Sequence, residues 1–289
     1  MVAPVQQESP FRAEAPSAPA APAPIRQEVP RRQEAPPAAA TEDHIGRLSP
    51  VYRQSRSHTL NQKLLADNRC LSVYSDSFEI ESYKMLRTQI MQRTRPNGWN
   101  TIMITSALPN EGKTLTAINL ALTFAKEFNH TVLLVDCDLR NQSVHNVLGI
   151  KSERGLINAL LENHPLQDLI IWPGIEKFSL ISGGRTISES SEVLSSAKMK
   201  ALVNEIKSRY PDRYVIFDLP PVLSVADAVA FAPSVDAILM VVQAEKTSAQ
   251  DINKAVELLP KEKFIGFVLN RCKTRSKAYP EMYETTEAS

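Results

Sequence analysis

One stretch near the middle of this 289-residue chain constrains its fold more than any other feature. An apolar, β-prone run at residues 102–105 leads into the loop ALPNEGKT at residues 107–114, and a helical pattern follows to residue 124. The order strand, tight loop, helix places Gly112, Lys113 and Thr114 at a helix N-terminus, where unpaired N–H groups and the helix dipole favour anions. The stretch is therefore a phosphate-binding loop (P-loop), with Ala107 in place of the usual first glycine.

The residue types in this loop suit a nucleotide bound with a metal ion. Gly112 lets the backbone approach a phosphate, Lys113 adds positive charge for the β- and γ-phosphates, and the hydroxyl of Thr114 suits Mg²⁺. We therefore predict ATP and Mg²⁺ as the bound species. The predicted ATP-binding residues are Pro109, Asn110, Glu111, Gly112, Lys113, Thr114 and Leu115, with Asn270 and Arg271 after the last predicted strand, near the expected adenine.

Two further apolar runs end in carboxylates. Residues 132–135 lead to Asp136 and Asp138, and residues 214–217 lead to Asp218. A single aspartate after a strand is often only a helix cap or turn residue. Parallel strands, however, end at one edge of an α/β sheet, where such folds bind ligands. We predict that Asp138 and Asp218 hold Mg²⁺ or its waters together with Thr114.

The predicted catalytic residues are Lys113, Asp136 and Asp138. Asp136 is placed to orient or deprotonate an incoming hydroxyl, although the sequence leaves its role and that of Asp138 interchangeable. Arg140 follows the same strand and either stabilises phosphate charge or pairs with an acid.

The composition excludes several classes of protein. The 33 basic and 32 acidic residues are balanced, so we expect no nucleic-acid partner. The cysteines Cys70, Cys137 and Cys272 lie far apart and fit neither a disulfide framework nor a zinc site, as expected in a reducing cytosol. No apolar run approaches the ~20 residues that cross a bilayer, and no signal-peptide pattern is present. We therefore expect a cytoplasmic protein that reaches the membrane only through a partner.

Both ends of the chain differ in composition from its centre. Ten of the twenty prolines precede residue 51, and large apolar residues are scarce there, so we predict a disordered tail over residues 1–70. We predict an ordered domain over residues 75–275. It opens with a helix at residues 78–93, capped by Asp76. Residues 276–289 form a polar, flexible tail that carries Tyr279 and Tyr283.

The remaining pattern alternates helices with strands. Continuous apolar strands separated by helices indicate an α/β fold with a mostly parallel sheet covered by helices on both faces. A capping box of Thr247 and Gln250 opens the last predicted helix, which runs to residue 259. The other predicted elements are helices at 143–148, 155–162, 192–210 and 226–231, and strands at 178–181, 237–242 and 264–270.

Three of these segments together resemble the bacterial tyrosine kinases of capsular and exopolysaccharide synthesis, in their soluble cytoplasmic form. Residues 107–114, 132–140 and 214–221 are similar to the Walker A, A′ and B motifs of that family, and the resemblance extends from about residue 78 to 270. The family motif for ring-like self-association, Glu-x-x-Arg-x-x-Arg, reads Glu81, Lys84 and Arg87 here. A lysine keeps the charge but lacks the planar guanidinium fork.

The resemblance implies a function. It implies a P-loop NTPase of the ParA/MinD-like class that autophosphorylates C-terminal tyrosines in trans between subunits, with Tyr279 and Tyr283 as acceptors. It also implies a homo-oligomer and a membrane chain-length-regulator protein as activating partner. ParA and MinD ATPases carry a second lysine at the position of Leu108, which argues against their partitioning functions.

Two classes of function remain open from the sequence. The first is a protein-tyrosine autokinase that uses ATP and Mg²⁺. The second is an ATP-binding and ATP-hydrolysing switch that controls assembly with a membrane partner, without tyrosine chemistry. The sparse tyrosines of the tail favour the second class, whereas Leu108 and the family motifs favour the first. A small-molecule kinase lacks any visible substrate motif.

Overall fold

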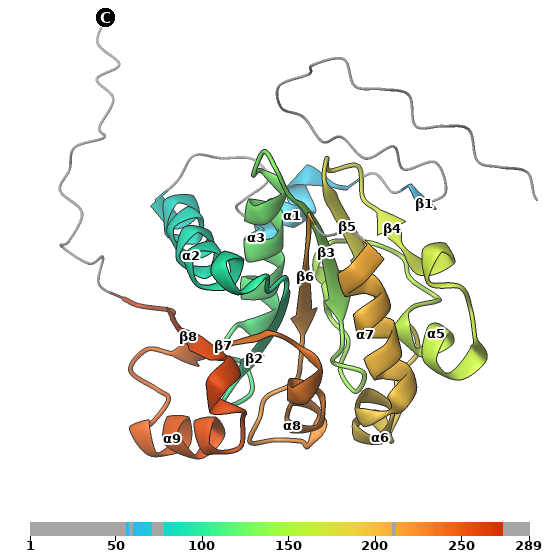
Figure 1. Ribbon diagram of the computed structural model, residues 1–289. Coiled ribbons are helices and arrows are strands. Elements are labelled where there is room, and N and C mark those ends of the chain that lie inside the picture. The colour runs from blue at the N-terminus through green and yellow to red at the C-terminus, as the bar shows by residue number, and fades with distance from the viewer. Residues whose placement is uncertain (1–55, 58–59, 71–77, 210–211, 274–289) are drawn as a thin grey trace, which may run out of the picture. The chain divides into compact units, whose positions relative to one another are not determined.

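The computed structural model describes residues 56–57, 60–70, 78–209 and 212–273. The predicted cap Asp76 and the predicted phosphoacceptors Tyr279 and Tyr283 lie outside these residues. The described part is an α/β fold with one sheet between two layers of helices (Figure 1), as the alternating pattern predicts. No helix in the described ranges is long and apolar enough to span a bilayer.

The sheet has eight strands in the order β1-β4-β5-β3-β6-β2-β7-β8. All pairings are parallel except that of β4 with β5. The three strands that end in the P-loop and in the predicted carboxylates, β2, β3 and β6, are central neighbours. The strands are β1 (Arg56–Ser57), β2 (Thr101–Ser106), β3 (Thr131–Asp136), β4 (Ile171–Trp172), β5 (Phe178–Ile181), β6 (Arg213–Asp218), β7 (Ala237–Gln243) and β8 (Phe264–Asn270).

The helices cover both faces of the sheet. Apolar residues of α1 to α4 pack on one face and those of α5 to α9 on the other. The α-helices are α1 (Gln62–Asp67), α2 (Phe78–Thr94), α3 (Lys113–Ala125), α4 (Val144–Val147), α5 (Leu156–Glu162), α6 (Ser190–Ser195), α7 (Ala197–Arg209), α8 (Asp227–Phe231) and α9 (Ala249–Glu257). Short 3-10 turns occupy Arg95–Asn97, Leu166–Leu169, Ala232–Ser234 and Lys261–Lys263.

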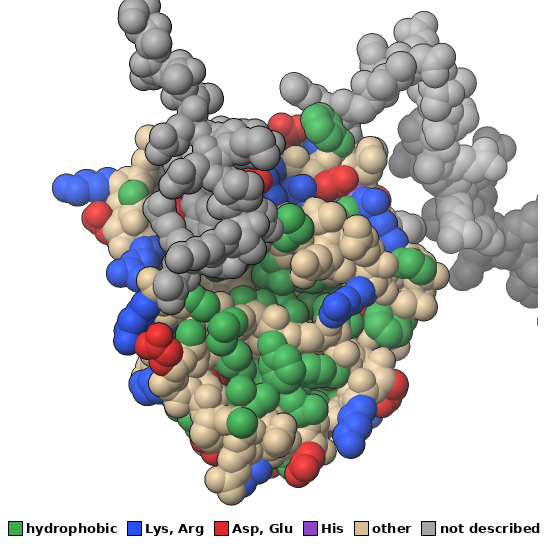
Figure 2. Space-filling model, turned by 90° about the vertical axis from the view of Figure 1, so that its left-hand side faces the viewer, with side chains coloured by type: hydrophobic (Ala, Val, Ile, Leu, Met, Phe, Trp, Pro, Cys, Tyr) green, Lys and Arg blue, Asp and Glu red, His purple; other side chains and the backbone are tan. Residues whose placement is uncertain are grey.

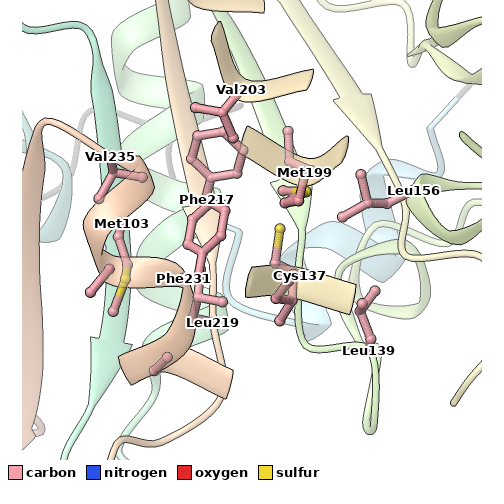
Figure 3. Packing of buried hydrophobic residues seen from close by; sticks show 14 of the residues in the cluster. Met103, Cys137, Leu139, Leu156, Met199, Val203, Phe217, Leu219, Phe231 and Val235 are labelled. Carbon is pink, nitrogen blue, oxygen red and sulfur yellow. The ribbon is translucent and has the colours of Figure 1, made fainter. Parts of the chain in front are cut away.

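Successive strand residues point to opposite faces, so each central strand is apolar on both sides. In β2, Ile102 and Ile104 pack under α2 and α3, whereas Met103 packs under the other helix layer. Figure 3 shows that second cluster, in which Phe217 of β6 meets Phe231 of α8 with ring centroids 5.0 Å apart. These two packed faces explain the continuous apolar runs in the sequence and hold the strand ends rigidly.

The predicted N-terminal tail is wrong in its last part. Residues 60–70 contain α1, in which Leu65 is fully buried. The side-chain amide of Asn68 donates to the carbonyl oxygen of Val147 at the end of α4, 2.8 Å away. A six-residue helix gains its stability from such packing rather than from its own sequence. Composition alone therefore could not reveal it.

The predicted helix at 192–210 is two helices. Ser196 interrupts it with extended backbone at φ −62° and ψ 153°. Its hydroxyl accepts a hydrogen bond from the backbone N–H of Met199, 3.1 Å away, and so caps the start of α7. Serine competes with helix backbone in this way, and the apolar periodicity hid the break.

The predicted capping box before α9 is displaced by one residue. Ser248, not Thr247, is the N-cap, and its hydroxyl accepts from the backbone N–H of Asp251, 3.0 Å away. The hydroxyl of Thr247 instead donates to Glu111 of the P-loop. The pattern therefore predicted the helix start to within one residue but assigned Thr247 a local partner instead of a distant one.

One edge of the sheet exposes apolar side chains. Strand β8 ends the strand order, and its side chains Phe267 and Leu269 are exposed. Figure 2 shows hydrophobic side chains gathered on the side of the molecule that carries α2, β8 and α9. The guanidinium of Arg93 in α2 donates to the carbonyl oxygen of Ile265 at the same strand. This contact satisfies one of the backbone carbonyl groups that an edge strand otherwise leaves without a partner strand.

Candidate nucleotide-binding site

The predicted site residues meet at the carboxyl ends of β2, β3 and β6. Asp136 and Asp218 are the last residues of adjacent parallel strands and lie opposite each other in register. The P-loop turns back toward them through left-handed backbone at Asn110, with φ 64°, and at Gly112, with φ 94°. Gly112 is the N-cap of α3, so the first N–H groups of that helix point into the site.

Lys113 is the cation of this cluster. Its ammonium donates to Asp138 at 2.8 Å and lies 3.7 Å from a carboxylate oxygen of Asp218. Burial alone would lower the pKa of Lys113, but Asp218 and Asp138 outweigh it, so the pKa is raised. Lys113 therefore stays protonated at neutral pH and keeps a positive charge beside the P-loop amides.

The oxygen atoms around Thr114 fit Mg²⁺. The hydroxyl of Thr114 donates to one oxygen of Asp218 at 2.6 Å, and the other oxygen of Asp218 has no hydrogen-bond partner in the described residues although it is buried. Among those residues, no three His, Cys, Asp or Glu side chains are arranged to hold a metal by themselves. Mg²⁺ is usually bound by one or two protein oxygens together with waters and phosphates, and this pair of oxygens fits that chemistry.

Asp136 is fully buried beneath the site. One of its oxygens accepts the backbone N–H of Asp138, and the other accepts those of Ser143 and Val144, each at 3.1 Å. Burial, followed by the neighbouring carboxylate of Asp218, raises the pKa of Asp136 to about 8. Because its oxygens accept these three N–H groups, Asp136 holds the backbone of residues 138, 143 and 144 in place at the end of β3.

The apolar residues beside the carboxylates fix their directions. Cys137 and Leu219 follow Asp136 and Asp218 directly and are buried in the cluster of Figure 3. Burial, followed by Asp136, raises the pKa of the Cys137 thiol, so this cysteine is an apolar filler rather than a nucleophile. Because Cys137 and Leu219 are anchored in the core, the aspartates next to them in the chain are held at the carboxyl edge of the sheet.

Arg140 pairs with an acid rather than standing free. Its Nε lies 3.6 Å from an oxygen of Asp227, which is fully buried at the start of α8. The Arg140 side chain is 40% exposed, so part of the guanidinium remains at the surface. Of the two roles that the sequence left open for Arg140, the structure gives evidence for the ion pair.

Comparison with known proteins agrees with this geometry. The chain matches the family model of an AAA domain over residues 100–263. It is 33% identical over 220 residues to the tyrosine-protein kinase YwqD of Bacillus subtilis (strain 168), an alignment that covers 75% of this chain and 90% of the relative. The chain belongs to the bacterial tyrosine kinase family.

Solved structures support the fold of this family member. The kinase domain of the Escherichia coli tyrosine kinase ETK aligns with a TM-score of 0.64 at 28% identity, over 80% of this chain and 94% of that domain. The cell division ATPase MinD of Pyrococcus furiosus aligns with a TM-score of 0.52 at 26% identity, over 63% of this chain and 76% of MinD. The predicted P-loop fold of the ParA/MinD-like class is therefore confirmed.

The structure brings most predicted residues of this bacterial tyrosine kinase homologue together. Pro109 and Asn110 are exposed on the P-loop, and the Leu115 side chain packs into the core, leaving only its backbone to face the site. Asn270 lies against the P-loop, where its side-chain amide donates to the carbonyl oxygen of Glu111, 2.8 Å away. Arg271 is exposed beside it.

The predicted oligomer residues lie on α2, away from the strand ends that form the site. Glu81 and Lys84 form an ion pair of 2.6 Å within the helix. The guanidinium of Arg87 donates to the carbonyl oxygen of Thr123 near the end of α3, 2.8 Å away. Arg87 thus has a role within the chain, and its predicted subunit contact stays a prediction.

Three residues of the site were not predicted. Ser143 donates its backbone N–H to Asp136, and its hydroxyl lies 3.4 Å from that of Thr114. Asp227 supports Arg140, and Thr247 contacts the P-loop. None of them lies in the three motif segments, residues 107–114, 132–140 and 214–221, and the fold of the chain brings each of them to the site. The single available signal was Thr247, whose position after a strand suggested a helix cap.

Proposed function

We propose that this chain is an ATP- and Mg²⁺-dependent protein-tyrosine autokinase that regulates exopolysaccharide synthesis or export. The observation that carries the proposal is the cluster of Lys113, Thr114, Asp138 and Asp218 at the end of the P-loop strand, in a chain of the bacterial tyrosine kinase family. Phosphoryl transfer needs mainly positioning and charge neutralisation, and this cluster supplies both.

In the proposed reaction, the backbone N–H groups of residues 110–115 and the ammonium of Lys113 bind the phosphates of ATP, while Pro109, which has no N–H, shapes the start of the loop. Thr114 and Asp218 would hold Mg²⁺, and Asp138 would contact it through a water molecule, which leaves a carboxylate oxygen of Asp138 for the proton. When bound, Mg²⁺ neutralises charge that develops on the phosphate oxygens. The phenol oxygen of a tyrosine forms a bond to the γ-phosphorus while the bond from that phosphorus to the bridging oxygen breaks, and ADP leaves.

The phenol proton passes to a carboxylate at the strand ends. Asp138 is the better placed of the two candidates, because it is 4% exposed, whereas Asp136 is fully buried and its oxygens accept three backbone N–H groups. We therefore assign proton acceptance to Asp138, and to Asp136 the task of holding the backbone N–H of Asp138 in place. This assignment is our proposal for the two roles that the sequence left interchangeable.

The proposed setting follows the family. Tyr279 and Tyr283 are the proposed acceptors, in trans between subunits of a homo-oligomer. A membrane chain-length-regulator protein is the proposed activating partner, which would place this chain at the inner face of the cell membrane. The balanced charge of the sequence supports a protein partner rather than a nucleic acid.

A second candidate function uses the same site. The chain would bind and slowly hydrolyse ATP and thereby switch its assembly with the membrane partner, without phosphorylating tyrosine. The fold shared with MinD, an ATPase by its name, favours this alternative. Nucleotide binding is common to both candidates, so only the fate of the γ-phosphate separates them.

Intact-mass spectrometry separates the two candidates. The full chain is incubated with ATP and Mg²⁺, with and without the cytoplasmic segment of the membrane partner, and any phosphate is located by fragmentation. Phosphate on Tyr279 or Tyr283 that is absent from Lys113→Met is the expected result. ATP turnover without phosphate on the protein, under activating conditions, would instead establish the switch.

A further inference from the structure

Glu111 is a buried carboxylate inside the P-loop. It is 2% exposed, and both of its oxygens accept hydrogen bonds. One oxygen accepts from the backbone N–H of Leu108 in the same loop, 2.7 Å away. The other accepts from the backbone N–H of Gln243, 3.3 Å away, and from the hydroxyl of Thr247. The carboxylate thus joins the P-loop to the turn between β7 and α9.

The end of β8 closes this connection from a second side. The side-chain amide of Asn270 donates to the backbone carbonyl of Glu111, 2.8 Å away. The backbone carbonyl oxygen of Asn270 accepts from the backbone N–H of Ala244, which lies in the β7–α9 turn, 2.9 Å away. Asn270 also lies so close to Gly112 that an added Cβ there would come within 2.2 Å of its amide nitrogen. The P-loop, the β7–α9 turn and the end of β8 therefore form one hydrogen-bonded unit.

The backbone on each side of Glu111 adopts a conformation that its own sequence allows but does not impose. Asn110 and Gly112 both have left-handed backbone. Glycine adopts this conformation freely and asparagine more readily than most residues, so the local sequence permits the turn without fixing it. The hydrogen bonds of Glu111 lie between these two residues, and they fix the turn that aims the P-loop N–H groups.

We propose that Glu111 is a positioning residue for nucleotide binding. Its side chain does not contact the nucleotide; it holds the P-loop against Thr247 and Gln243, so that the loop amides are already arranged for the diphosphate of a nucleotide. A loop ordered before binding loses less conformational freedom when the ligand binds. The inference rests on the nucleotide binding of the proposed function and does not depend on tyrosine phosphorylation.

Isothermal titration of ADP with Mg²⁺ tests this role directly, with the full chain and the variants Glu111→Gln and Thr247→Val. Glutamine keeps the shape but removes the charge and replaces one acceptor oxygen by an NH₂ donor, which then faces a hydrogen-bond donor, so ADP affinity should fall about tenfold to hundredfold. Thr247→Val replaces the hydroxyl, which donates to Glu111 and accepts the backbone N–H of Gln243 at 3.0 Å, by a methyl group, and a fall of about threefold to tenfold is expected. In the double variant the losses should combine to less than their product, because both act on one network.

Asp236→Asn is a matched control. The Asp236 carboxylate also accepts two backbone N–H groups, of Asn100 and Thr101, and the Thr101 hydroxyl. These contacts lie at the start of β2, whereas the P-loop follows its end. Asp236→Asn should lower the melting temperature at least as much as Glu111→Gln while leaving ADP affinity within about twofold of wild type.

The outcomes separate this inference from the proposed kinase activity. ADP affinity of Glu111→Gln within about twofold of wild type would overturn the positioning role. Equal losses of affinity in Asp236→Asn and Glu111→Gln would overturn it too, because they would reflect general destabilisation. A wild-type chain that binds no ADP would remove the nucleotide site and this inference together. Intact ADP binding without tyrosine phosphorylation would affect the kinase proposal alone.

Discussion

The ammonium nitrogen of Lys113 lies 2.8 Å from a carboxylate oxygen of Asp138. The two residues are 25 positions apart in the sequence and belong to different elements. Asp218 also faces this ammonium, so one cation serves two carboxylates. The charge balance of the site therefore depends on Lys113 and on the protonation of the acids around it.

Replacing Lys113 by methionine should abolish phosphorylation while the chain still folds. Without the ammonium, Asp138 and Asp218 lose their cation, and their ionised forms become less stable in the folded protein. The variant should therefore lose more stability relative to wild type at pH 8 than at pH 5. Thermal unfolding at the two pH values and a phosphotransfer assay test both parts.

Lys126→Met is the matched control, because Lys126 is exposed just after α3. It should change neither the activity nor the pH dependence of stability. Full kinase activity of Lys113→Met would contradict the assignment of the P-loop lysine.

Asp136→Asn should change how stability depends on pH. Burial, followed by Asp218, raises the pKa of Asp136 from 3.8 to about 8. A carboxyl group with a higher pKa in the folded than in the unfolded protein favours folding fully below the unfolded value, and this contribution is lost as the pH rises through the folded value. Asparagine cannot ionise, so the stability of the variant relative to wild type should increase between about pH 4 and pH 8 and then level off.

Urea unfolding at several pH values measures this difference for Asp136→Asn. A constant offset between variant and wild type across the whole range would show that the pKa of Asp136 is not raised. Asparagine also loses an acceptor for backbone N–H groups, and this loss shifts the free energy of unfolding by the same amount at every pH. The change of the variant-minus-wild-type difference with pH therefore reports the ionisation of Asp136.

Replacing Glu81 and Arg87 together by alanine should shift any oligomer toward the monomer. These residues are the predicted subunit contact on α2, but Arg87 also donates to Thr123 within the chain. The melting temperature must therefore be recorded alongside the elution volume from a sizing column. Gln89→Ala, an exposed position on the same helix, is the control. An unchanged elution profile for the double variant would leave α2 as an ordinary solvated helix.

Leu65→Ala should destabilise the chain by about 2–5 kcal/mol, the usual cost of removing a buried leucine side chain. Leu65 is fully buried in the cluster beneath α3 and α4, although it lies within the predicted disordered tail. Lys63→Ala, at an exposed position of the same helix, should have little effect. Equal melting temperatures for Leu65→Ala and wild type would mean that α1 does not contribute to the stability of the fold.

The sequence by itself determined the fold class and the central motifs of this protein. The P-loop and the carboxylates Asp136, Asp138 and Asp218 are each recognisable locally, because each follows an apolar strand that must be buried on both faces. Parallel strands then bring these residues to one edge of the sheet. The helices α2 and α3 were predicted from their helical sequence patterns, and the strand β8 from its continuous apolar run.

Only the tertiary structure decided which groups these residues contact. Three contacts join segments that are distant in the sequence. They are the ion pair of Lys113 with Asp138, the ion pair of Arg140 with Asp227, and the hydrogen bond between Glu111 and Thr247. The helix α1 likewise exists through its packing on α3 and α4. Local propensity and periodicity report what a segment favours alone, whereas the partner of a buried polar group is set by which segments the folded chain places within hydrogen-bond distance.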